Sequence, residues 1–379
     1  MMVDDHRAGG ADGARRPDAP PWWLFRGTGE PVDGKLPWPP APAWRRFPAP
    51  AHEGAAPPGD DDAIARHRRA IAALLLGPEQ IAAVNVGLLL RRPLLVTGPP
   101  GMGGAGLAQL IARELRLGRV LRWTVNSRTT LREGIYDYDV LGVAHSALLE
   151  RPTEPAGEAG GLSGPRGSVG DHLADRPAAG SPPVPRHIRL GPLATALLPR
   201  VRPRVLLVDR FDRCGHDLPD DLLDVIEEGR VVVPELARLP SADGPFRVAV
   251  DDPGGHAEVG DGVVACAEFP VMVITSNGER DFSPAFRRRC VAVQLPEPSR
   301  DELEALVAAE FGADSRAAAL VERFENSRGA GAELTVDHLF DALHLASAGV
   351  LDEDAARTLD AVWGRESAGS ARRLPGRLL

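Results

Sequence analysis

The sequence is poor in cysteine, carries no excess of positive charge and has no unbroken apolar run long enough to cross a membrane. Its three cysteines, Cys214, Cys266 and Cys290, share no metal-ligand spacing, so we expect free thiols in a reducing compartment. The formal net charge of −9 argues against general nucleic-acid binding through surface charge. The apolar stretch 71–96 is interrupted by Gly-Pro-Glu-Gln and Arg-Arg-Pro, so it indicates core elements and no membrane span. Residues 1–7 lack the regions of a signal peptide, which predicts a cytoplasmic protein.

The length of 379 residues suits one large α/β domain and one small second domain. We expect a disordered N-terminus at 1–20, a Trp- and Pro-rich extended arm at 21–60, an α/β core at 61–298 with a flexible insertion at 143–186, a helical lid at 299–350, and a C-terminal helix and tail at 351–379. The arm either packs on the core or docks a partner. The insertion is either a solvated spacer or a substrate-contacting loop.

Apolar runs that alternate with helical patterns predict a parallel sheet covered by helices on both faces. In such a sheet ligands bind at the carboxyl ends of the strands. Residues 127–138 predict a polar loop and a helix, and residues 234–268 a β-hairpin. The predicted strands are 93–97, 120–125, 204–209, 271–276 and 291–295. Two predicted helices, 63–76 and 78–90, precede the first strand, and three more, 300–311, 316–326 and 336–347, form the lid.

A glycine-rich turn between the first predicted strand and a helical pattern has the spacing of a phosphate-binding P-loop. In the pattern G-x-x-x-x-G-K-[ST] the lysine position is Gly104 and the hydroxyl position is Ala105. Backbone N–H groups and the helix dipole still favour phosphate there. The candidate phosphate-binding residues are Gly98, Pro99, Pro100, Gly101, Met102, Gly103, Gly104 and Ala105.

The two missing side chains weaken this candidate site. The lysine normally contacts the β- and γ-phosphates, and the hydroxyl ligates Mg²⁺. Loss of one charge-assisted phosphate contact costs about 1.5–3 kcal/mol, or about ten- to a hundredfold in affinity. We therefore expect binding of ATP or ADP to be weak or lost, and binding of Mg²⁺ to be impaired.

A second nucleotide motif has the same defect. The apolar run Val205–Asp209 ends in a carboxylate, as in a Walker B strand, and Asp209 is the candidate Mg²⁺ ligand, through water. Hydrolysing proteins of this type place a glutamate next, whereas this chain has Arg210, which cannot act as a general base. Arg210 either substitutes for the missing lysine or forms a structural ion pair with Asp209 or Asp212.

Four motifs in this order resemble those of the MoxR-like branch of AAA+ ATPases. After the two motifs above, residues 271–277 resemble the strand of the sensor 1 asparagine, here Asn277, and residues 286–290 resemble an arginine-finger segment with Arg288 and Arg289 at the matching positions. Residues 217–229 resemble the helix after Walker B, and residues 22–29 the opening of an actinobacterial subgroup. The alternative for Arg288 and Arg289, without a catalytic role, is a solvated basic turn.

The resemblance implies a P-loop NTPase AAA+ fold, with a five-stranded parallel sheet followed by a small helical lid. It also implies catalytic positions at Asp209, Asn277, Arg288 and Arg289, and assembly into homo- or hetero-oligomers with AAA+ subunits. A protein client or a von Willebrand factor A-domain partner is a further implication. Residues 333–337, which correspond to the sensor 2 region, contain no arginine.

These features favour a pseudo-ATPase, a AAA+ subunit that keeps the fold without turning over ATP and acts as a scaffold or regulatory subunit. The alternative is an active AAA+ ATPase that remodels client proteins and has a substitute for each missing group. A decaying gene product without a selected function is a third possibility, although the intact core patterns argue against gross misfolding.

Overall fold

The computed structural model describes residues 20–32, 38–52, 56–59, 62–98, 104–143, 184–240, 244–312, 315–329, 334–349 and 363. The predictions for the N-terminus, for nearly all of the insertion and for the C-terminal tail lie outside these residues. Residues 99–103 of the glycine-rich turn also lie outside them.

The centre of the fold is a parallel sheet of five strands in the order β11-β1-β10-β5-β2. All residues of β5 and β10 are buried, as apolar strands are when helices cover both faces of a sheet. The strands are β1 (Leu94–Thr97), β2 (Leu121–Thr124), β5 (Val205–Asp209), β10 (Val271–Ser276) and β11 (Val291–Gln294). Each lies within a predicted run, which confirms the predicted α/β fold class with its covered parallel sheet, consistent with a P-loop AAA+ fold.

Successive side chains of a strand point to opposite faces of the sheet, so a strand of apolar residues needs helices packed on both faces. Val205 and Leu207 of β5 pack in one core with the first group of helices, whereas Leu206 and Val208 pack in a second core with the other group. The first group is α1 (Ala63–Leu74), α2 (Pro78–Leu90) and α3 (Gly104–Glu114), and the second is α6 (Pro192–Ala196), α7 (Leu218–Glu228) and α9 (Pro284–Arg289).

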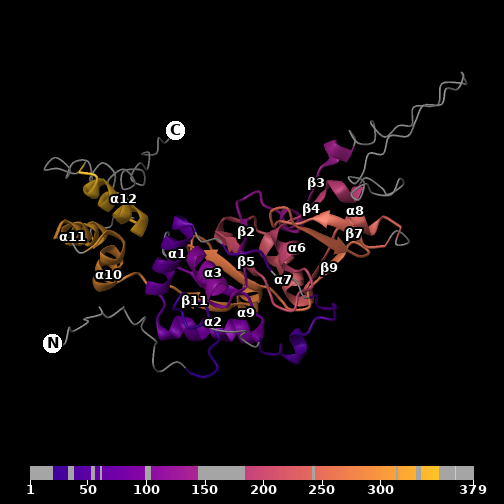
Figure 1. Ribbon diagram of the computed structural model, residues 1–379, viewed down its shortest axis with the longest axis horizontal. Coiled ribbons are helices and arrows are strands. Elements are labelled where there is room, and N and C mark those ends of the chain that lie inside the picture. Colours follow the sequence, from indigo (N-terminus) through magenta and orange to yellow (C-terminus); the bar gives the residue numbers. More distant parts are fainter. Residues whose placement is uncertain are drawn as a thin grey trace, which may run out of the picture.

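Three more helices form a separate bundle at one end of the molecule (Figure 1). They are α10 (Arg300–Phe311), α11 (Ser315–Gly329) and α12 (Val336–Ser347), at the positions where the sequence predicts lid helices. Their core contains Leu303, Phe324 and Leu339, and also Ile71 of α1 and Leu75, which directly follows that helix. Helix α1 therefore joins the helical bundle to the α/β core.

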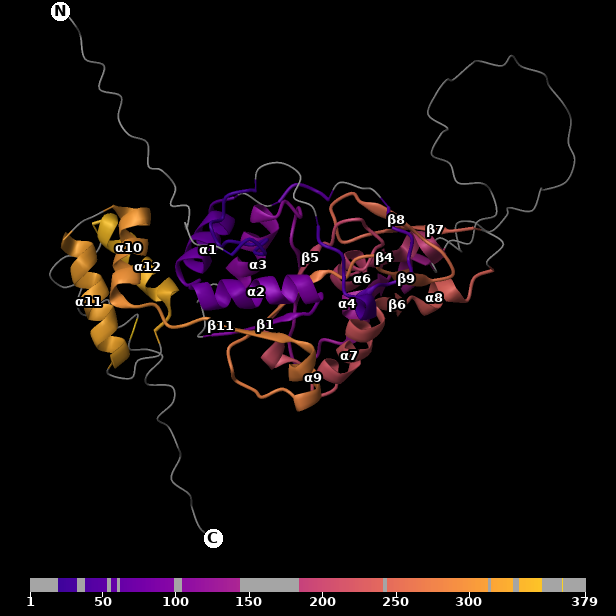
Figure 2. The same ribbon diagram turned by 90° about the horizontal axis from the view of Figure 1, so that it is seen from below.

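A second, four-stranded sheet lies at the opposite end from the bundle (Figure 2). Its strands, in order, are β3 (Tyr136–Tyr138), β4 (Ile188–Leu190), β7 (Phe246–Ala249) and β8 (His256–Val259). Strands β7 and β8 form an antiparallel hairpin within the predicted range 234–268. Residues 127–138 differ in part from the prediction, because only α4 (Leu131–Ile135) is helical and β3 follows it directly. The remaining elements are β6 (Arg230–Val232), its partner β9 (Val263–Ala265), α8 (Pro234–Ala237) and the short 3-10 helices η1 (Ala43–Arg45), η2 (Val184–His187) and η3 (Phe211–Arg213).

The N-terminal arm packs along the α/β core. Phe25 is fully buried, and the Asn85 side chain of α2 accepts from the Phe25 backbone N–H at 2.9 Å and donates to its carbonyl at 2.7 Å. The buried Glu114 carboxylate accepts from backbone N–H groups of residues 26, 28 and 29. Trp44, in contrast, is 77% exposed. These contacts agree with the prediction that the arm packs on the core, whereas the exposed Trp44 agrees with the alternative that the arm docks a partner.

Two compositional features have a structural counterpart. The three cysteines are buried, and burial raises the pKa of Cys266 and of Cys290 to about 12. Within the described part of the chain, no single helix has both the length and the apolar composition of a membrane span. The pair α1 and α2 passes that test only when taken together, and the two helices meet at a bend of 111°.

Candidate nucleotide site

A cavity of about 500 Å³ lies at the carboxyl ends of the central strands and contains most of the described candidate residues. Arg288 and Arg289 are not among its lining residues, and Pro99, Pro100, Gly101, Met102 and Gly103 lie outside the described part of the chain. The candidate residues that line it are Gly98, Gly104, Ala105, Asp209, Arg210 and Asn277. The structure therefore brings the ends of the glycine-rich turn together with the Walker B and sensor 1 positions.

The described ends of the glycine-rich turn are tightly packed. Gly98 follows β1, and a Cβ atom there would lie 3.1 Å from Cβ of Leu295. Helix α3 begins at Gly104, and two residues later a Cβ atom on Gly106 would lie 2.1 Å from the Arg68 carbonyl oxygen of α1. Gly106 thus permits the close contact of α1 with α3 that forms one wall of the cavity.

Both oxygens of the Walker B carboxylate are engaged by protein groups. Asp209 is only 8% exposed, and its Oδ1 accepts from Oγ1 of Thr275 at 2.9 Å. Its Oδ2 lies 2.5 Å from a guanidinium nitrogen of Arg122. Arg122 comes from β2, where the parallel register pairs Thr124 with Asp209 and places Arg122 two residues earlier, on the same face of the strand as Thr124. An arginine therefore supplies the positive charge next to this carboxylate.

The residues of this cavity do not fit Mg²⁺. Asp209 is already paired with Arg122 and Thr275, and Ala105 has no hydroxyl to ligate a metal. No group of three or more His, Cys, Asp or Glu side chains in the described part of the chain is arranged to hold a metal ion. Hard cations such as Mg²⁺ prefer oxygen ligands that are free to coordinate.

Arg210 adopts a left-handed backbone conformation, with φ 60° and ψ 49°. Its backbone N–H donates to Oγ1 of Thr275 at 2.9 Å, so one hydroxyl links the backbone of Arg210 to the side chain of Asp209. The Arg210 side chain is exposed and lines the cavity. The predicted ion pair of Arg210 with Asp209 or Asp212 is not formed, because the Asp209 carboxylate is paired with Arg122 and the Asp212 carboxylate with backbone N–H groups.

Asp212 fixes the loop that follows β10, where the resemblance implies the sensor 1 asparagine. Its buried carboxylate accepts from the backbone N–H of Asn277 at 2.9 Å and from that of Glu279 at 3.3 Å. Asn277 directly follows β10 and lines the cavity. The sensor 1 position is therefore held in place by its main chain, and its side-chain amide stands at the cavity wall.

Further charged residues that the sequence did not single out line the same cavity. Arg68 of α1 and Arg213 of η3 add to the positive charge of Arg122 and Arg210. Asp337, in the first turn of α12, brings a carboxylate from the helical bundle to the region where the resemblance implies a sensor 2 arginine. The only sequence signal for Arg122 is its outward position in the alternating strand Leu-Arg-Trp-Thr beside the Walker B strand.

The two arginine-finger candidates differ in their surroundings. Both lie on the short helix α9, which Phe286 anchors in the core. Nε of Arg289 donates to the Glu227 carboxylate of α7 at 2.7 Å. The Arg288 side chain is exposed and makes no ion pair within the described residues. Of the two, Arg288 has the side chain that is available to a neighbouring subunit.

Comparison with known proteins gives little. No family model matches the chain, and a comparison with curated proteins found no match. Among similar solved structures is a candidate ATPase from Cytophaga hutchinsonii, with 10% sequence identity and a TM-score of 0.31, aligned over 66% of this chain. The match spans 58% of that protein's length. A likeness at this level says nothing about activity, so function rests on the geometry of the site.

Proposed function

We propose that this protein is a MoxR-like AAA+ pseudo-ATPase, with weak or no hydrolysis of bound nucleotide. It acts as a scaffold or regulatory subunit in a chaperone-like AAA+ assembly. The observation that carries the proposal is the Asp209 carboxylate, whose two oxygens are held by Arg122 and Thr275.

Phosphoryl transfer by P-loop proteins depends on a lysine, a metal ion and a group that orients the attacking water. Gly104 and Ala105 supply neither the lysine nor the hydroxyl, and Arg210 cannot accept a proton. Arg122 adds a fourth obstacle, because a metal ion approaching Asp209 has to displace a guanidinium from the same oxygen. Four independent features of the site thus oppose hydrolysis.

A regulatory role is supported by α9. An arginine finger acts on the site of the neighbouring subunit, so it keeps its use after the subunit's own site is lost. The exposed Arg288 suits this role, whereas Arg289 is paired with Glu227. Partners under this proposal are AAA+ subunits of the same or another kind, together with a protein client or a von Willebrand factor A-domain protein.

The alternative function is an active AAA+ ATPase that remodels clients. The observation in its favour is the positive charge around the cavity, where Arg68, Arg122 and Arg210 could bind phosphate in place of the lysine. Under this alternative Arg210→Ala abolishes nucleotide binding.

One experiment separates the two. Release of inorganic phosphate from ATP with Mg²⁺ is measured on the purified chain, and ATP and ADP binding is followed by calorimetry with Mg²⁺ and with EDTA. The pseudo-ATPase proposal expects weak or no turnover and an affinity that Mg²⁺ leaves unchanged. Brisk, Mg²⁺-dependent phosphate release by the unaltered protein would refute it and establish the alternative.

A further inference from the structure

A second and larger cavity, of about 680 Å³, lies at the opposite edge of the central sheet. It is lined by residues that precede β2 and β5, such as Val120 and Arg204, whereas the nucleotide site lies at the carboxyl ends of these strands. Five residues of β5 at about 3.3 Å each separate the two edges by roughly 16 Å. Neighbouring residues of α1 serve the two cavities, with Arg68 at the nucleotide site and Arg69 at this one.

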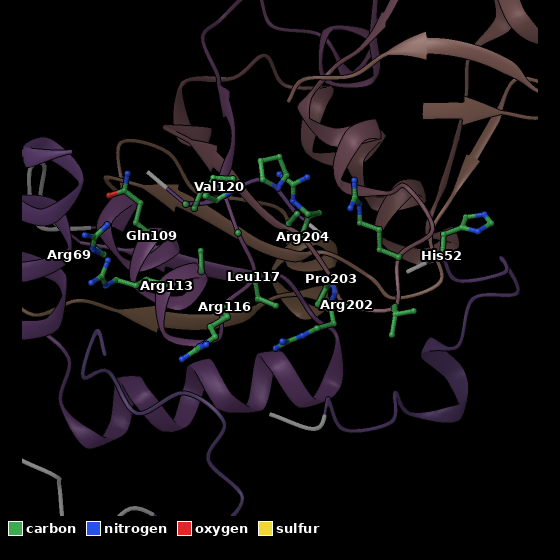
Figure 3. A pocket seen from close by; sticks show the side chains of 18 residues that line it. His52, Arg69, Gln109, Arg113, Arg116, Leu117, Val120, Arg202, Pro203 and Arg204 are labelled. Carbon is green, nitrogen blue, oxygen red and sulfur yellow. The ribbon is translucent and has the colours of Figure 1, made fainter. Parts of the chain in front are cut away.

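The wall of this cavity is strongly positive. Among the described residues that line it there is no aspartate or glutamate, although the chain as a whole has a net charge of −9. Figure 3 shows Arg69, Gln109 and Arg113 gathered at one end of the cavity, with Arg202 and Arg204 further along it. The arginines that line it are Arg69, Arg113, Arg116, Arg200, Arg202 and Arg204. We call this space the arginine cavity.

Part of this charge is compensated within the fold. The guanidinium of Arg204, buried to 1% exposure, forms a bidentate pair with Asp252 at 2.6 and 2.9 Å. Arg113 and Arg116 lie near the C-terminal end of α3, where the helix dipole stabilises positive charge. Other contacts within the chain are made by Arg69, Arg113 and Arg200. One terminal nitrogen of Arg202 donates to the Leu115 carbonyl.

Compensation is incomplete at the wall itself. The Nε atoms of Arg202 and Arg204 are buried without a hydrogen-bond partner in the described part of the chain. Burial lowers the pKa of Arg202, and burial together with the charge of Arg204 lowers that of Arg200. Desolvation of these cations costs free energy, and the charge of a bound anion would offset part of that cost.

The shape of the cavity limits the ligand. Its volume falls in the range of small-molecule sites and exceeds the space that one phosphate requires. Between the arginines the wall is apolar, with Pro58, Leu117, Val120 and Pro203 among its residues. Arginine forks bind phosphate oxygens in pairs, without a metal ion. We propose that the arginine cavity binds a small polyphosphate, free or carried on an organic body, independently of Mg²⁺ and of the nucleotide site.

The N-terminal arm gives this binding a structural consequence. His52 lines the cavity, and its backbone N–H donates to the Pro199 carbonyl at 3.0 Å. Pro57 also lines it, and its carbonyl accepts from the Arg119 N–H at 2.9 Å. A ligand in the cavity contacts both the arm and the ends of the sheet, so it protects the arm from proteolysis.

The test uses calorimetry of the full chain in EDTA, with tripolyphosphate and with ATP as probes. Both probes bind to the unaltered protein, and a higher salt concentration lowers their affinity. Arg202→Gln lowers the affinity about ten- to a hundredfold, the value of one charge-assisted contact. Arg116→Gln, at an exposed position, gives a loss in the same direction and serves if Arg202→Gln unfolds the protein. Stronger binding of ATP than of tripolyphosphate assigns the apolar wall to the organic body, and equal binding assigns recognition to the phosphates.

Two control variants make the result specific. Arg247→Gln, at an exposed site on β7, leaves the affinity in EDTA unchanged. Arg122→Gln, at the nucleotide site, measures any share of the binding that occurs there. The proposal is overturned if neither probe binds more tightly than sulfate. It is also overturned if Arg122→Gln abolishes binding while Arg202→Gln and Arg116→Gln do not. Either result leaves the pseudo-ATPase proposal intact, because that proposal is tested by phosphate release.

Discussion

Replacement of Arg122 tests whether a guanidinium occupies the place of the metal at Asp209. Arg122→Gln removes the positive charge 2.5 Å from Oδ2 and leaves the Thr275 hydroxyl on Oδ1. The Arg122 side chain is 44% exposed, so the pair lies between a surface ion pair and a buried one. We expect a loss of about 1 kcal/mol in the free energy of unfolding. For a domain of this size that lowers Tm by about 2–4 °C.

The functional effect has the opposite direction. Once Arg122 is gone, Asp209 regains an oxygen that can ligate Mg²⁺, so ATP binding to Arg122→Gln becomes Mg²⁺-dependent by about fivefold or more, or about 1 kcal/mol. The assay is calorimetry of ATP with Mg²⁺ and with EDTA, on the parent, on Arg122→Gln and on the exposed control Arg247→Gln. An identical response to Mg²⁺ in all three proteins would refute the reasoning.

Restoration of hydrolysis follows the same logic. A variant with Gly104→Lys, Ala105→Thr and Arg210→Glu stays inactive, because Asp209 remains paired with Arg122. Addition of Arg122→Gln to these three changes starts phosphate release. A Cβ atom at residue 104 lies 3.1 Å from Cγ2 of Thr275, so that methyl group has to shift by a few tenths of an ångström. Hydrolysis by the variant with three changes would show that Arg122 does not block the site.

Three further predictions concern stability and assembly. Asp252→Asn breaks a buried ion pair with Arg204 and lowers the free energy of unfolding by about 3–5 kcal/mol in chemical denaturation. In the parent, burial alone would raise the pKa of Asp252, but the hydrogen bonds and the charge of Arg204 outweigh burial and lower that pKa. The stability that this ion pair contributes is therefore fully present above the ordinary pKa of a carboxylate. It is lost as the pH falls through the lowered pKa. In Gly106→Ala the new methyl group collides with the Arg68 carbonyl and pushes α1 away from α3, which lowers the free energy of unfolding by about 1–3 kcal/mol in the same assay. An unchanged denaturation midpoint would contradict this close packing. Arg288→Ala leaves nucleotide binding by the chain itself unchanged but lowers the hydrolysis of a competent neighbouring subunit about 10³-fold or more, measured in mixed assemblies.

The strands and helices of the core could be predicted from local pattern alone. β5 and β10 each begin with four consecutive apolar residues, a pattern that predicts a buried strand. Helix α10 begins where Ser299 and Glu302 form a capping box. Strand β3 was missed because its partner β4 follows more than forty residues later, and such pairing leaves no local signal.

The candidate site was predictable only in part. The motifs identified Asp209 and Asn277, and the parallel sheet brings both to one edge. The interpretation of Arg210 as a structural ion pair was wrong, since Asp212 binds backbone N–H groups instead. Arg122 was overlooked because its partner is set by the register between β2 and β5.

The sequence by itself determined which segments form the central sheet and which groups of a working P-loop site are absent, because both are properties of short stretches of chain. Tertiary structure alone decided that Arg122 neutralises Asp209, that Asp337 of α12 lines the same cavity, and that six arginines from α1, from the C-terminal end of α3 and the residues after it, and from the segment before β5 line another. Charge interactions act between groups that are close in space, and only the folded chain brings these side chains together.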